Sequence, residues 1–231
     1  MLRKWEDLPD FMKTKEVRPY WKFLYKRRGQ LALKRAFDVV VAAVLLVFLA
    51  IPMVVIGIWI KLDSEGPVFY RQERVTTYGK HFKIHKFRTM VTNADKIGTA
   101  VTVGEDPRIT RVGHKLRKLR LDELPQVIDV LKGDMSFVGT RPEAVKYVEK
   151  YQRKYNATLL MPAGITSEAS IRFKDEDKLL NGVDDVDNAY INRVLPKKMR
   201  LNLKSLKSFS LKNELGTMFK TVITVFGKEY E

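Results

Sequence analysis

The feature that most constrains this chain is an apolar run that carries no charge for 22 residues, from Val39 to Ile60. A helix rises about 1.5 Å per residue, so this run is long enough to cross the roughly 30 Å hydrocarbon core of a bilayer. Helices of soluble proteins normally turn one polar face to water, and this run has none. Residues 34–62 are therefore predicted to form a membrane helix.

Pro52 lies inside the apolar run and leaves two topologies open. Proline removes one backbone hydrogen bond and clashes with the preceding turn, so a helix broken at Pro52 can enter one leaflet and return. The alternative is a kinked helix that spans the bilayer, since membrane helices tolerate proline. Physical arguments alone slightly favour the spanning helix.

The flanks of the run are both basic. Residues 16–35 hold seven Lys or Arg and one acid, whereas residues 61–80 hold four and three. The stronger flank is predicted to be cytoplasmic by the positive-inside rule. A carboxylate near the membrane is costly unless paired, and Asp38 follows Arg35 by one helical turn. An ion pair between Arg35 and Asp38 at the membrane interface is therefore predicted.

The 231 residues allow one domain together with a membrane anchor, and their net charge is +16. This charge implies anionic partners, and the apolar run favours acidic lipid headgroups and phosphorylated substrates over nucleic acid. The absence of cysteine excludes disulfides, thiolate metal sites and a cysteine nucleophile. Residues 1–33 are basic and aromatic, which is typical of a segment at the membrane interface or of a loose N-terminal extension.

Two short strands are predicted after the apolar run, at Val68–Tyr70 and at His81–His85, joined by a loop that contains Tyr78-Gly79. Strand alternation puts His81, Lys83 and His85 on one face. Two histidines at that spacing are compatible with a metal, but no third ligand is evident, so a solvated face is favoured. A very basic helix is then predicted from Thr110 to Arg120.

A pair of carboxylates follows the basic helix. Asp122 is expected to cap a helix that ends near Lys132-Gly133, with Glu123 favoured by the helix dipole, and both roles are purely structural. Thr140 and Glu143 match a capping box, which predicts a second helix start with Arg141 at an anion-binding N-terminus. Carboxylates suited to Mg²⁺ beside arginines suited to phosphate indicate phosphoryl transfer.

These stretches resemble the bacterial sugar transferase family, the small monotopic phosphoglycosyl transferases. The resemblance covers Lys34 to Thr166 in order. Its motifs are Lys34-Arg35-x-x-Asp38, GPVFYRQER at 66–74, KFRTM at 86–90, LDELPQ at 121–126, LKGDMSFVGTRP at 131–142 and PAGIT at 162–166. The chain is similar to the minimal form, without a multi-pass domain in front.

The resemblance implies an α+β, mainly helical fold with a re-entrant membrane helix, a small β-hairpin and amphipathic interfacial helices. It implies transfer of a phosphosugar from a UDP-sugar to undecaprenyl phosphate with release of UMP, as the first membrane step of capsule, exopolysaccharide or glycoconjugate synthesis. Asp122 would be the nucleophile, Glu123 would help it hold Mg²⁺, and Lys86 would lie in the active site. Phosphate would be bound by Arg88, Arg117 and Arg141.

The implied location is the cytoplasmic face of the bacterial inner membrane, in contact with acidic phospholipid. The identity of the sugar and the choice between monomer and homodimer are left open. Four segments are expected: residues 1–33, an interfacial segment; 34–62, the membrane helix; 63–166, the catalytic core; and 167–231, a substrate-shaping loop with helices. Within the last two, the sequence predicts an amphipathic helix over 143–155, an acidic loop over 168–187, a helix over 188–203 interrupted at Pro196, and a largely apolar helix over 211–226.

Two other functions compete with this one. A membrane-anchored module could bind nucleic acid or acidic lipid through the basic helix without catalysis, and would need neither Asp122 nor Glu123. A phosphatase could use the same aspartyl-phosphate chemistry but would hydrolyse the intermediate.

Overall fold

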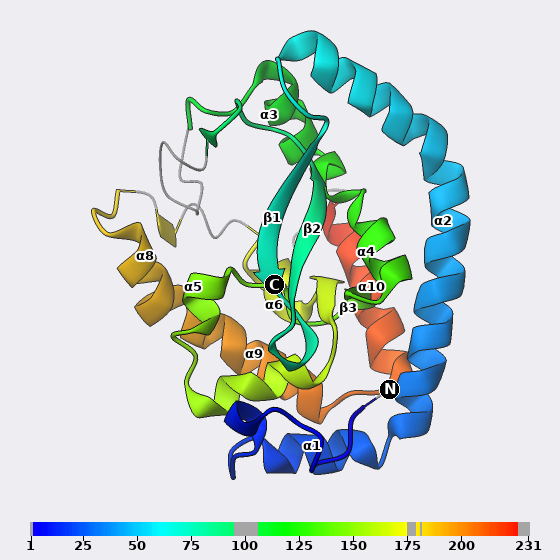
Figure 1. Cartoon of the computed structure of the whole chain (residues 1–231), viewed down its shortest axis with the longest axis vertical. Coiled ribbons are helices and arrows are strands. Elements are labelled where there is room, and N and C mark those ends of the chain that lie inside the picture. Colours follow the sequence, from blue (N-terminus) through cyan, green and yellow to red (C-terminus); the bar gives the residue numbers. More distant parts are fainter. Residues whose placement is uncertain (1, 95–105, 175–178, 181, 226–231) are drawn as a thin grey trace.

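The computed structural model describes residues 2–94, 106–174, 179–180 and 182–225. Most of the predicted loop around residues 91–107, and part of the acidic loop 168–187, lie outside these ranges. The described part is mainly helical, with two small two-stranded sheets, so the predicted α+β class is confirmed. Figure 1 shows a long β-hairpin at the centre, with helices arranged around it.

The apolar run forms the larger part of α2 (Arg28–Asp63), a continuous helix of 36 residues. Pro52 lies inside α2 without ending it, so the predicted break at Pro52 is wrong, and the helix is continuous but curved. In Figure 1, α2 follows one side of the molecule and then bends over toward one end of the hairpin. By length and composition α2 can cross a membrane, and its outer side exposes large apolar residues: Val40, Val44, Val47, Phe48, Ile51, Val54, Val55 and Ile58.

The inner side of α2 packs on the rest of the protein. Ala42 is fully buried in a cluster that also contains Phe82, Ile84, Val127, Val130, Met135 and Phe137. Further along the helix, Ile56 and Ile60 are buried with Phe87, Val112 and Leu116. One side of α2 thus packs against the hydrophobic core, while the other side is apolar and exposed.

Polar contacts fix the first half of α2, but they differ from the predicted ion pair between Arg35 and Asp38. Arg35 donates to the carbonyl oxygens of Val130 at 2.6 Å and Leu131 at 2.9 Å, near the C-terminal end of a helix whose last carbonyls lack helical partners. Asp38 is buried and accepts a hydrogen bond of 2.8 Å from the Ser136 hydroxyl. The predicted Arg35–Asp38 ion pair is wrong, because each side chain has a partner elsewhere.

The predicted hairpin is confirmed. Strands β1 (Phe69–Val75) and β2 (His81–Phe87) pair antiparallel, and Tyr70 lies opposite Lys86. The connection runs through a short 3-10 turn, η2 (Thr77–Gly79), in which Tyr78 has φ 58° and Gly79 has φ 78°. Gly79 suits this left-handed conformation because it has no Cβ.

The basic helix and the segment after it also form. Helix α3 (Arg111–Lys118) leads into the 3-10 turn η4 (Leu121–Glu123), helix α4 (Gln126–Lys132) and strand β3 (Met135–Val138). Strand β3 pairs parallel with β4 (Ala163–Thr166). A Cβ on Gly164 would lie 2.1 Å from the Gly139 nitrogen, so this close approach of two backbone segments requires glycine.

The helix predicted over 143–155 is mostly wrong. Only α5 (Val145–Val148) is α-helical, and residues Arg153–Leu160 form the 3-10 segment η5. The capping box at Thr140 is also wrong, because α5 begins after Ala144. Glu143 turns away from Thr140 and accepts from the Tyr190 hydroxyl at 2.7 Å and from Lys198 at 3.3 Å. These buried partners compete successfully with a local cap.

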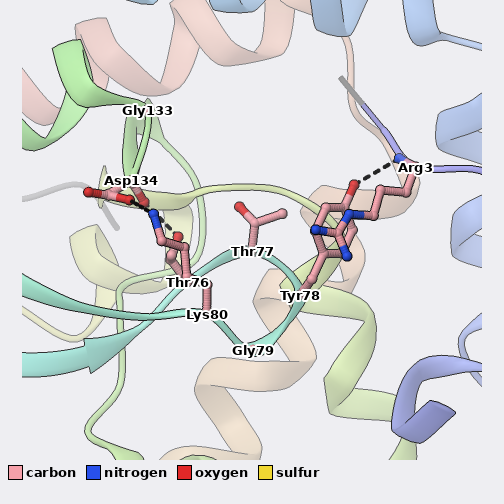
Figure 2. Close-up of a pocket in the computed structure, with 8 residues that line it drawn as sticks. All are labelled: Arg3, Thr76, Thr77, Tyr78, Gly79, Lys80, Gly133 and Asp134. Carbon is pink, nitrogen blue, oxygen red and sulfur yellow. Dashed lines mark hydrogen bonds and ion pairs between the residues drawn. The ribbon is translucent and has the colours of Figure 1, made fainter. Parts of the chain in front are cut away.

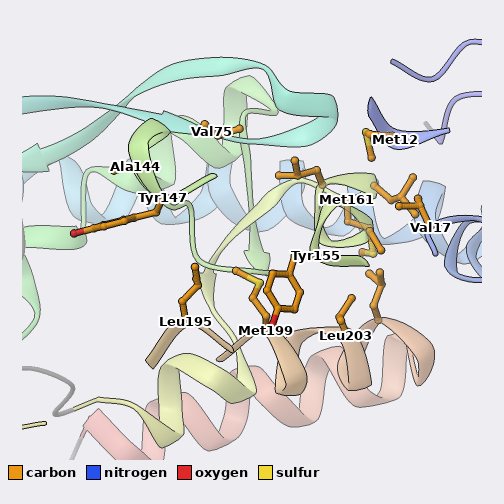
Figure 3. Packing of buried hydrophobic residues seen from close by; sticks show 14 of the residues in the cluster. Met12, Val17, Val75, Ala144, Tyr147, Tyr155, Met161, Leu195, Met199 and Leu203 are labelled. Atoms are coloured by element: carbon orange, nitrogen blue, oxygen red, sulfur yellow. The ribbon is translucent and has the colours of Figure 1, made fainter. Parts of the chain in front are cut away.

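The N-terminal segment is not a loose extension, and its position at the membrane interface stays a prediction. The 3-10 turn η1 (Asp10–Met12) and helix α1 (Arg18–Tyr25) pack on the domain, with Met12, Val17 and Leu24 fully buried. Figure 3 shows Met12 and Val17 in one cluster with Met199 and Leu203 of helix α9 (Leu195–Lys207). Residues before α2 and residues far beyond it therefore share one hydrophobic core.

The C-terminal part is helical. It contains α6 (Glu168–Arg172), α8 (Val186–Ala189), the π-helical segment η6 (Tyr190–Val194), α9 and α10 (Leu211–Val225). The predicted interruption at Pro196 is wrong, since Pro196 lies in the first turn of α9, where its missing N–H is tolerated. The helix predicted over 211–226 is confirmed. It lies beside α2, where Glu214 pairs with Lys34.

Candidate active site

Asp122 and Glu123 lie in the tight turn η4, between α3 and α4. The turn begins after Arg120, which has a left-handed backbone with φ 56°, and it closes with a hydrogen bond of 3.2 Å from the Leu124 nitrogen to the Leu121 carbonyl. Helix α4 starts only at Gln126, with Pro125 before it. Asp122 is therefore not the predicted helix cap, and its side chain is available for another role.

Glu123 is held by two cations from distant elements. Lys86, at the end of β2, donates to Glu123 Oε1 at 2.8 Å, and Arg141 donates to the same oxygen at 2.6 Å. Burial alone would raise the pKa of Glu123, but Arg141 and Lys86 together hold that pKa well below its usual range. Glu123 is thus a permanent anion that joins the hairpin to the loop after β3.

Asp122 is buried, but it differs from Glu123 in having no hydrogen bond to its carboxylate among the described residues. Burial raises the pKa of Asp122 above its usual value; Lys86 opposes this shift, and the negative charge of Glu123 adds to it. A buried carboxylate without fixed partners, surrounded by cations, is a reactive arrangement for attack on a phosphorus atom.

Two of the surrounding cations come from segments that sequence reasoning had singled out. Burial lowers the pKa of Lys86, and the charge of Glu123 opposes that shift. Burial also lowers the pKa of Arg117 on α3, with the carboxylate of Asp122 as the largest opposing influence. The structure therefore brings Lys86, Arg117 and Arg141 together around the two carboxylates, as the resemblance implied.

Arg141 reaches the site from a loop and not from a helix N-terminus. The segment from Thr140 to Ala144 has no regular secondary structure, and the guanidinium is positioned by Glu123. Arg74 of β1 supports this loop by donating to the Pro142 carbonyl at 3.4 Å. We did not predict a role for Arg74. Strand alternation from Tyr70, the cross-strand partner of Lys86, was the available signal.

Arg88 does not belong to this cluster, and its predicted phosphate-binding role is wrong. Its guanidinium donates to the Ser64 carbonyl at 2.7 Å, to the Ser64 hydroxyl at 3.0 Å and to the Glu65 carbonyl. These acceptors lie just after α2, where helix-end carbonyls lack partners of their own. Arg88 thus closes the turn that leads from the membrane helix to the hairpin.

His85 is buried, against the prediction of a solvated strand face. Its backbone nitrogen donates to Asp129 Oδ2 at 2.8 Å, and its ring Nδ1 lies 2.5 Å from Asp129 Oδ1. Asp129 on α4 is itself buried. This bidentate contact fixes β2 against α4 directly beside Lys86. Sequence reasoning missed Asp129 because its partner is 44 positions away.

The described residues contain no group of three or more metal-ligating side chains, either at the two histidines or at the acidic loop. Mg²⁺ often binds through only one or two carboxylates, the rest of its shell being water and substrate phosphate. Asp122 has an open carboxylate that fits this pattern, whereas both oxygens of Glu123 already face cations. The donor set therefore fits an ion held jointly by Asp122 and a phosphorylated substrate.

A separate pocket of about 310 Å³ lies at the tip of the hairpin. Figure 2 shows the Lys80–Asp134 ion pair at one side of it and Arg3 over the Tyr78 ring at the other. The lining residues do not include Lys86, Asp122, Glu123 or Arg141. This pocket is thus distinct from the cluster around the two carboxylates.

Comparison with known proteins identifies the family of the chain. A family model for bacterial sugar transferases matches residues 29–228. The chain belongs to the bacterial sugar transferase family.

Curated relatives of the chain carry consistent names. An Escherichia coli protein named UDP-glucose:undecaprenyl-phosphate glucose-1-phosphate transferase is 37% identical over 84% of this chain and 40% of its own length. A Caulobacter vibrioides protein with the same name is 34% identical over 82% of this chain and 68% of its own length. An Aeromonas hydrophila protein named UDP-N-acetylgalactosamine-undecaprenyl-phosphate N-acetylgalactosaminephosphotransferase is 34% identical over 84% of this chain. The chain spans less than half the length of the Escherichia and Aeromonas relatives.

Proposed function

We propose that the protein is a phosphoglycosyl transferase that moves a sugar phosphate from a UDP-sugar to undecaprenyl phosphate and releases UMP. The observation that carries this proposal is the open, buried carboxylate of Asp122 among three cations, beside a Glu123 that is neutralised by Lys86 and Arg141. The names of the relatives support the donor and the acceptor.

The first step is a displacement at the phosphorus that bears the sugar. An oxygen of ionised Asp122 attacks this atom, the bond to the bridging diphosphate oxygen breaks, and UMP leaves with the bonding electron pair. Arg117 and Arg141 neutralise the charge that develops on the phosphate oxygens. The product is an acyl phosphate that joins Asp122 to the sugar phosphate.

The second step returns Asp122 to its starting form. A phosphate oxygen of undecaprenyl phosphate attacks the same phosphorus, the bond to Asp122 breaks, and the polyprenyl diphosphate sugar leaves. Bound Mg²⁺ would supply charge neutralisation between the phosphates and Asp122. Glu123 keeps Lys86 and Arg141 in place through both steps, because neither of these two cations has to leave its carboxylate.

The shared core supports a membrane topology in which both ends of α2 lie on one side. Residues before α2, such as Met12 and Leu24, and residues after it, such as Met199, are buried in one cluster. A spanning α2 would place these two groups on opposite sides of the bilayer, so the packing supports a re-entrant helix with both ends on one side. UDP-sugars are cytoplasmic, and this supports the proposal that both ends lie at the cytoplasmic face of the inner membrane.

The proposal is tested by incubating the purified protein with Mg²⁺, undecaprenyl phosphate and a panel of UDP-sugars, and by measuring UMP release. One sugar or a few are expected to support turnover. In the absence of acceptor, intact-protein mass spectrometry should detect one added sugar phosphate, which Asp122→Asn abolishes. The matched control is Asp134→Asn, since Asp134 pairs with Lys80 outside the cluster. Turnover that is unchanged in Asp122→Asn would contradict the mechanism.

The competing functions predict other results in the same assay. A phosphatase would release sugar phosphate without acceptor, and undecaprenyl phosphate would not stimulate it. A basic lipid- or nucleic-acid-binding module would release no UMP with any donor. The precise neutralisation of Glu123 by Lys86 and Arg141 favours the enzyme, because a binding surface has no need of a buried ion-pair cluster.

A further inference from the structure

Helix α3 has two charged faces that point to different surroundings. Arg117 belongs to the active site, since among the charged groups Asp122 has the largest influence on its pKa. Arg111, Lys115 and Lys118 recur at helical spacing on an exposed face. The buried face of α3, with Val112 and Leu116, packs on the second half of α2. The exposed cations are therefore not needed for the proposed reaction.

The position of this face is set by its contacts with α2. Lys115 Nζ lies 5.4 Å from the centre of the Trp59 ring, and Arg111 lies 3.5 Å from Asp63 at the end of α2. Trp59 is half-exposed in the last turns of the apolar helix. Tryptophan favours the headgroup region of a bilayer, where its amphipathic ring meets both lipid and water. Lys115 is thereby placed at headgroup depth.

Two of these cations have no protein anion to neutralise them. Among the described residues, Lys115 and Lys118 form no ion pair. Both are exposed, and Leu119 beside them is 59% exposed. An exposed leucine next to exposed lysines is the combination by which peripheral helices contact membranes, with the apolar group among the acyl chains and the cations at the phosphates.

We propose that the face formed by Arg111, Lys115 and Lys118 binds the headgroups of anionic phospholipids. This inference rests on the proposed insertion of α2 in the membrane, because that insertion brings the face to the lipid surface. The contact would hold α3, and with it Arg117 and the turn that carries Asp122, at the depth where the phosphate of a polyprenyl acceptor lies. The face would thus set the height of the active site above the bilayer.

The experiment measures lipid enrichment next to α3. The chain has no cysteine, so Leu119→Cys gives a single site for a fluorescent donor. The labelled protein is reconstituted in phosphatidylcholine nanodiscs that contain a trace of acceptor-labelled phosphatidylglycerol or acceptor-labelled phosphatidylcholine. Each cation near an acidic surface contributes about fivefold to headgroup affinity. Energy transfer to phosphatidylglycerol should therefore exceed transfer to phosphatidylcholine.

The double charge reversal Lys115→Glu, Lys118→Glu should bring this ratio to about one, since it replaces attraction by repulsion. The matched control is Lys150→Glu, Lys154→Glu, which reverses two exposed lysines, the first between α5 and η5 and the second within η5, and should leave the ratio unchanged. The inference is overturned by a ratio of one in the parent, or by an equal loss in both double variants.

UMP release by the same samples in neutral detergent separates this inference from the proposed function. The charge-reversed variant should release UMP at the parent rate there, because detergent offers no acidic lipid surface. If the parent protein releases no UMP but enriches phosphatidylglycerol, the proposed function is contradicted and the lipid-binding face is supported. If the parent releases UMP without enriching phosphatidylglycerol, the proposed function is supported and the lipid-binding face is contradicted.

Discussion

Lys86 and Glu123 are 37 positions apart in the sequence, and their side chains meet in a hydrogen bond of 2.8 Å. The contact joins the end of the hairpin to the turn that carries Asp122. Because Arg141 binds the same carboxylate, one anion organises two cations from separate segments. Glu123 is therefore expected to act mainly as a positioning residue for the site.

The first prediction concerns this carboxylate. Glu123→Gln keeps the shape of the side chain but leaves Lys86 and Arg141 without their anion. We expect a loss of about 1–3 kcal/mol in stability, together with a large fall in turnover. Thermal unfolding in detergent and UMP release measure the two effects. Retention of both at the parent level would contradict the assigned role.

The pH dependence of stability gives an independent check on Glu123. Its pKa in the folded protein lies well below the usual value, so its ionised form stabilises the fold. This contribution is complete above the unfolded-state pKa of about 4.3 and is lost as pH falls through the folded-state pKa. Acid unfolding of the parent should therefore begin at lower pH and be steeper than acid unfolding of Glu123→Gln.

For Asp122 we expect the opposite effect of ionisation on the stability of the fold. Burial raises its folded-state pKa, so the cost of ionising Asp122 builds up as the pH rises above the unfolded-state pKa and is complete above the folded-state pKa. Asp122→Asn should raise the thermal midpoint at pH 7 while it lowers turnover by about 10³-fold or more. The gain should vanish below about pH 3.9, where the unfolded aspartate is protonated as well. A lower midpoint at pH 7 would show that the charge of Asp122 stabilises the protein.

The buried contact between His85 and Asp129 predicts a structural effect that spreads to the site. Asp129→Ala should cost about 3–5 kcal/mol, since it leaves a buried partner unpaired beside Lys86. Asp129→Asn keeps an acceptor for the His85 backbone nitrogen and should restore most of that loss. Thermal midpoints of the two variants decide the matter. Equal destabilisation by both would show that charge, and not hydrogen bonding, is what the contact supplies.

Arg88 offers a direct test of a corrected assignment. Because its guanidinium binds carbonyls just after α2, Arg88→Lys should lower the thermal midpoint without raising the KM for the UDP-sugar. Arg141→Lys is the matched comparison, since Arg141 lies in the cluster and its loss of bidentate geometry should raise KM. A large rise in KM for Arg88→Lys would restore the original phosphate-binding assignment.

Local sequence patterns predicted the elements well wherever one segment determines its own structure. The hairpin, the basic helix and the last helix formed as expected. Two capping assignments failed. Asp122 lies in the turn η4, and the helix after it starts only at Gln126, whereas at Thr140 long-range partners of Glu143 outweighed the local cap. Glu143, for example, is bound by Tyr190 and Lys198 from the C-terminal third of the chain.

Most residues of the site could be predicted from the sequence, but their arrangement in space could not. The family resemblance pointed to Lys86, Arg117, Asp122 and Arg141, and the structure brings them together. It also pointed to Arg88, which serves the turn after α2. Nothing in the sequence indicates which of several arginines near a motif turns toward a carboxylate, because that depends on the packing of α3 and β2. The support from Arg74 and Asp129 was missed for the same reason.

The last prediction concerns α2, whose two ends are tied to one core. Single cysteines at Lys4 and at Glu65, both exposed and on either side of α2, should be shielded from a membrane-impermeant thiol reagent added from the periplasm. Both should react after the membrane is permeabilised. Labelling of only one site in intact cells would support the spanning helix, because only then do the flanks lie on opposite sides.

Pro52→Ala tests the same topology by a second route. The substitution restores a helical hydrogen bond and straightens α2, which should pull Met12 and Leu24 from their core or cause part of the population to span the membrane. The variant is therefore expected to be less stable than the parent, whereas a spanning helix would gain about 3 kcal/mol from the same change.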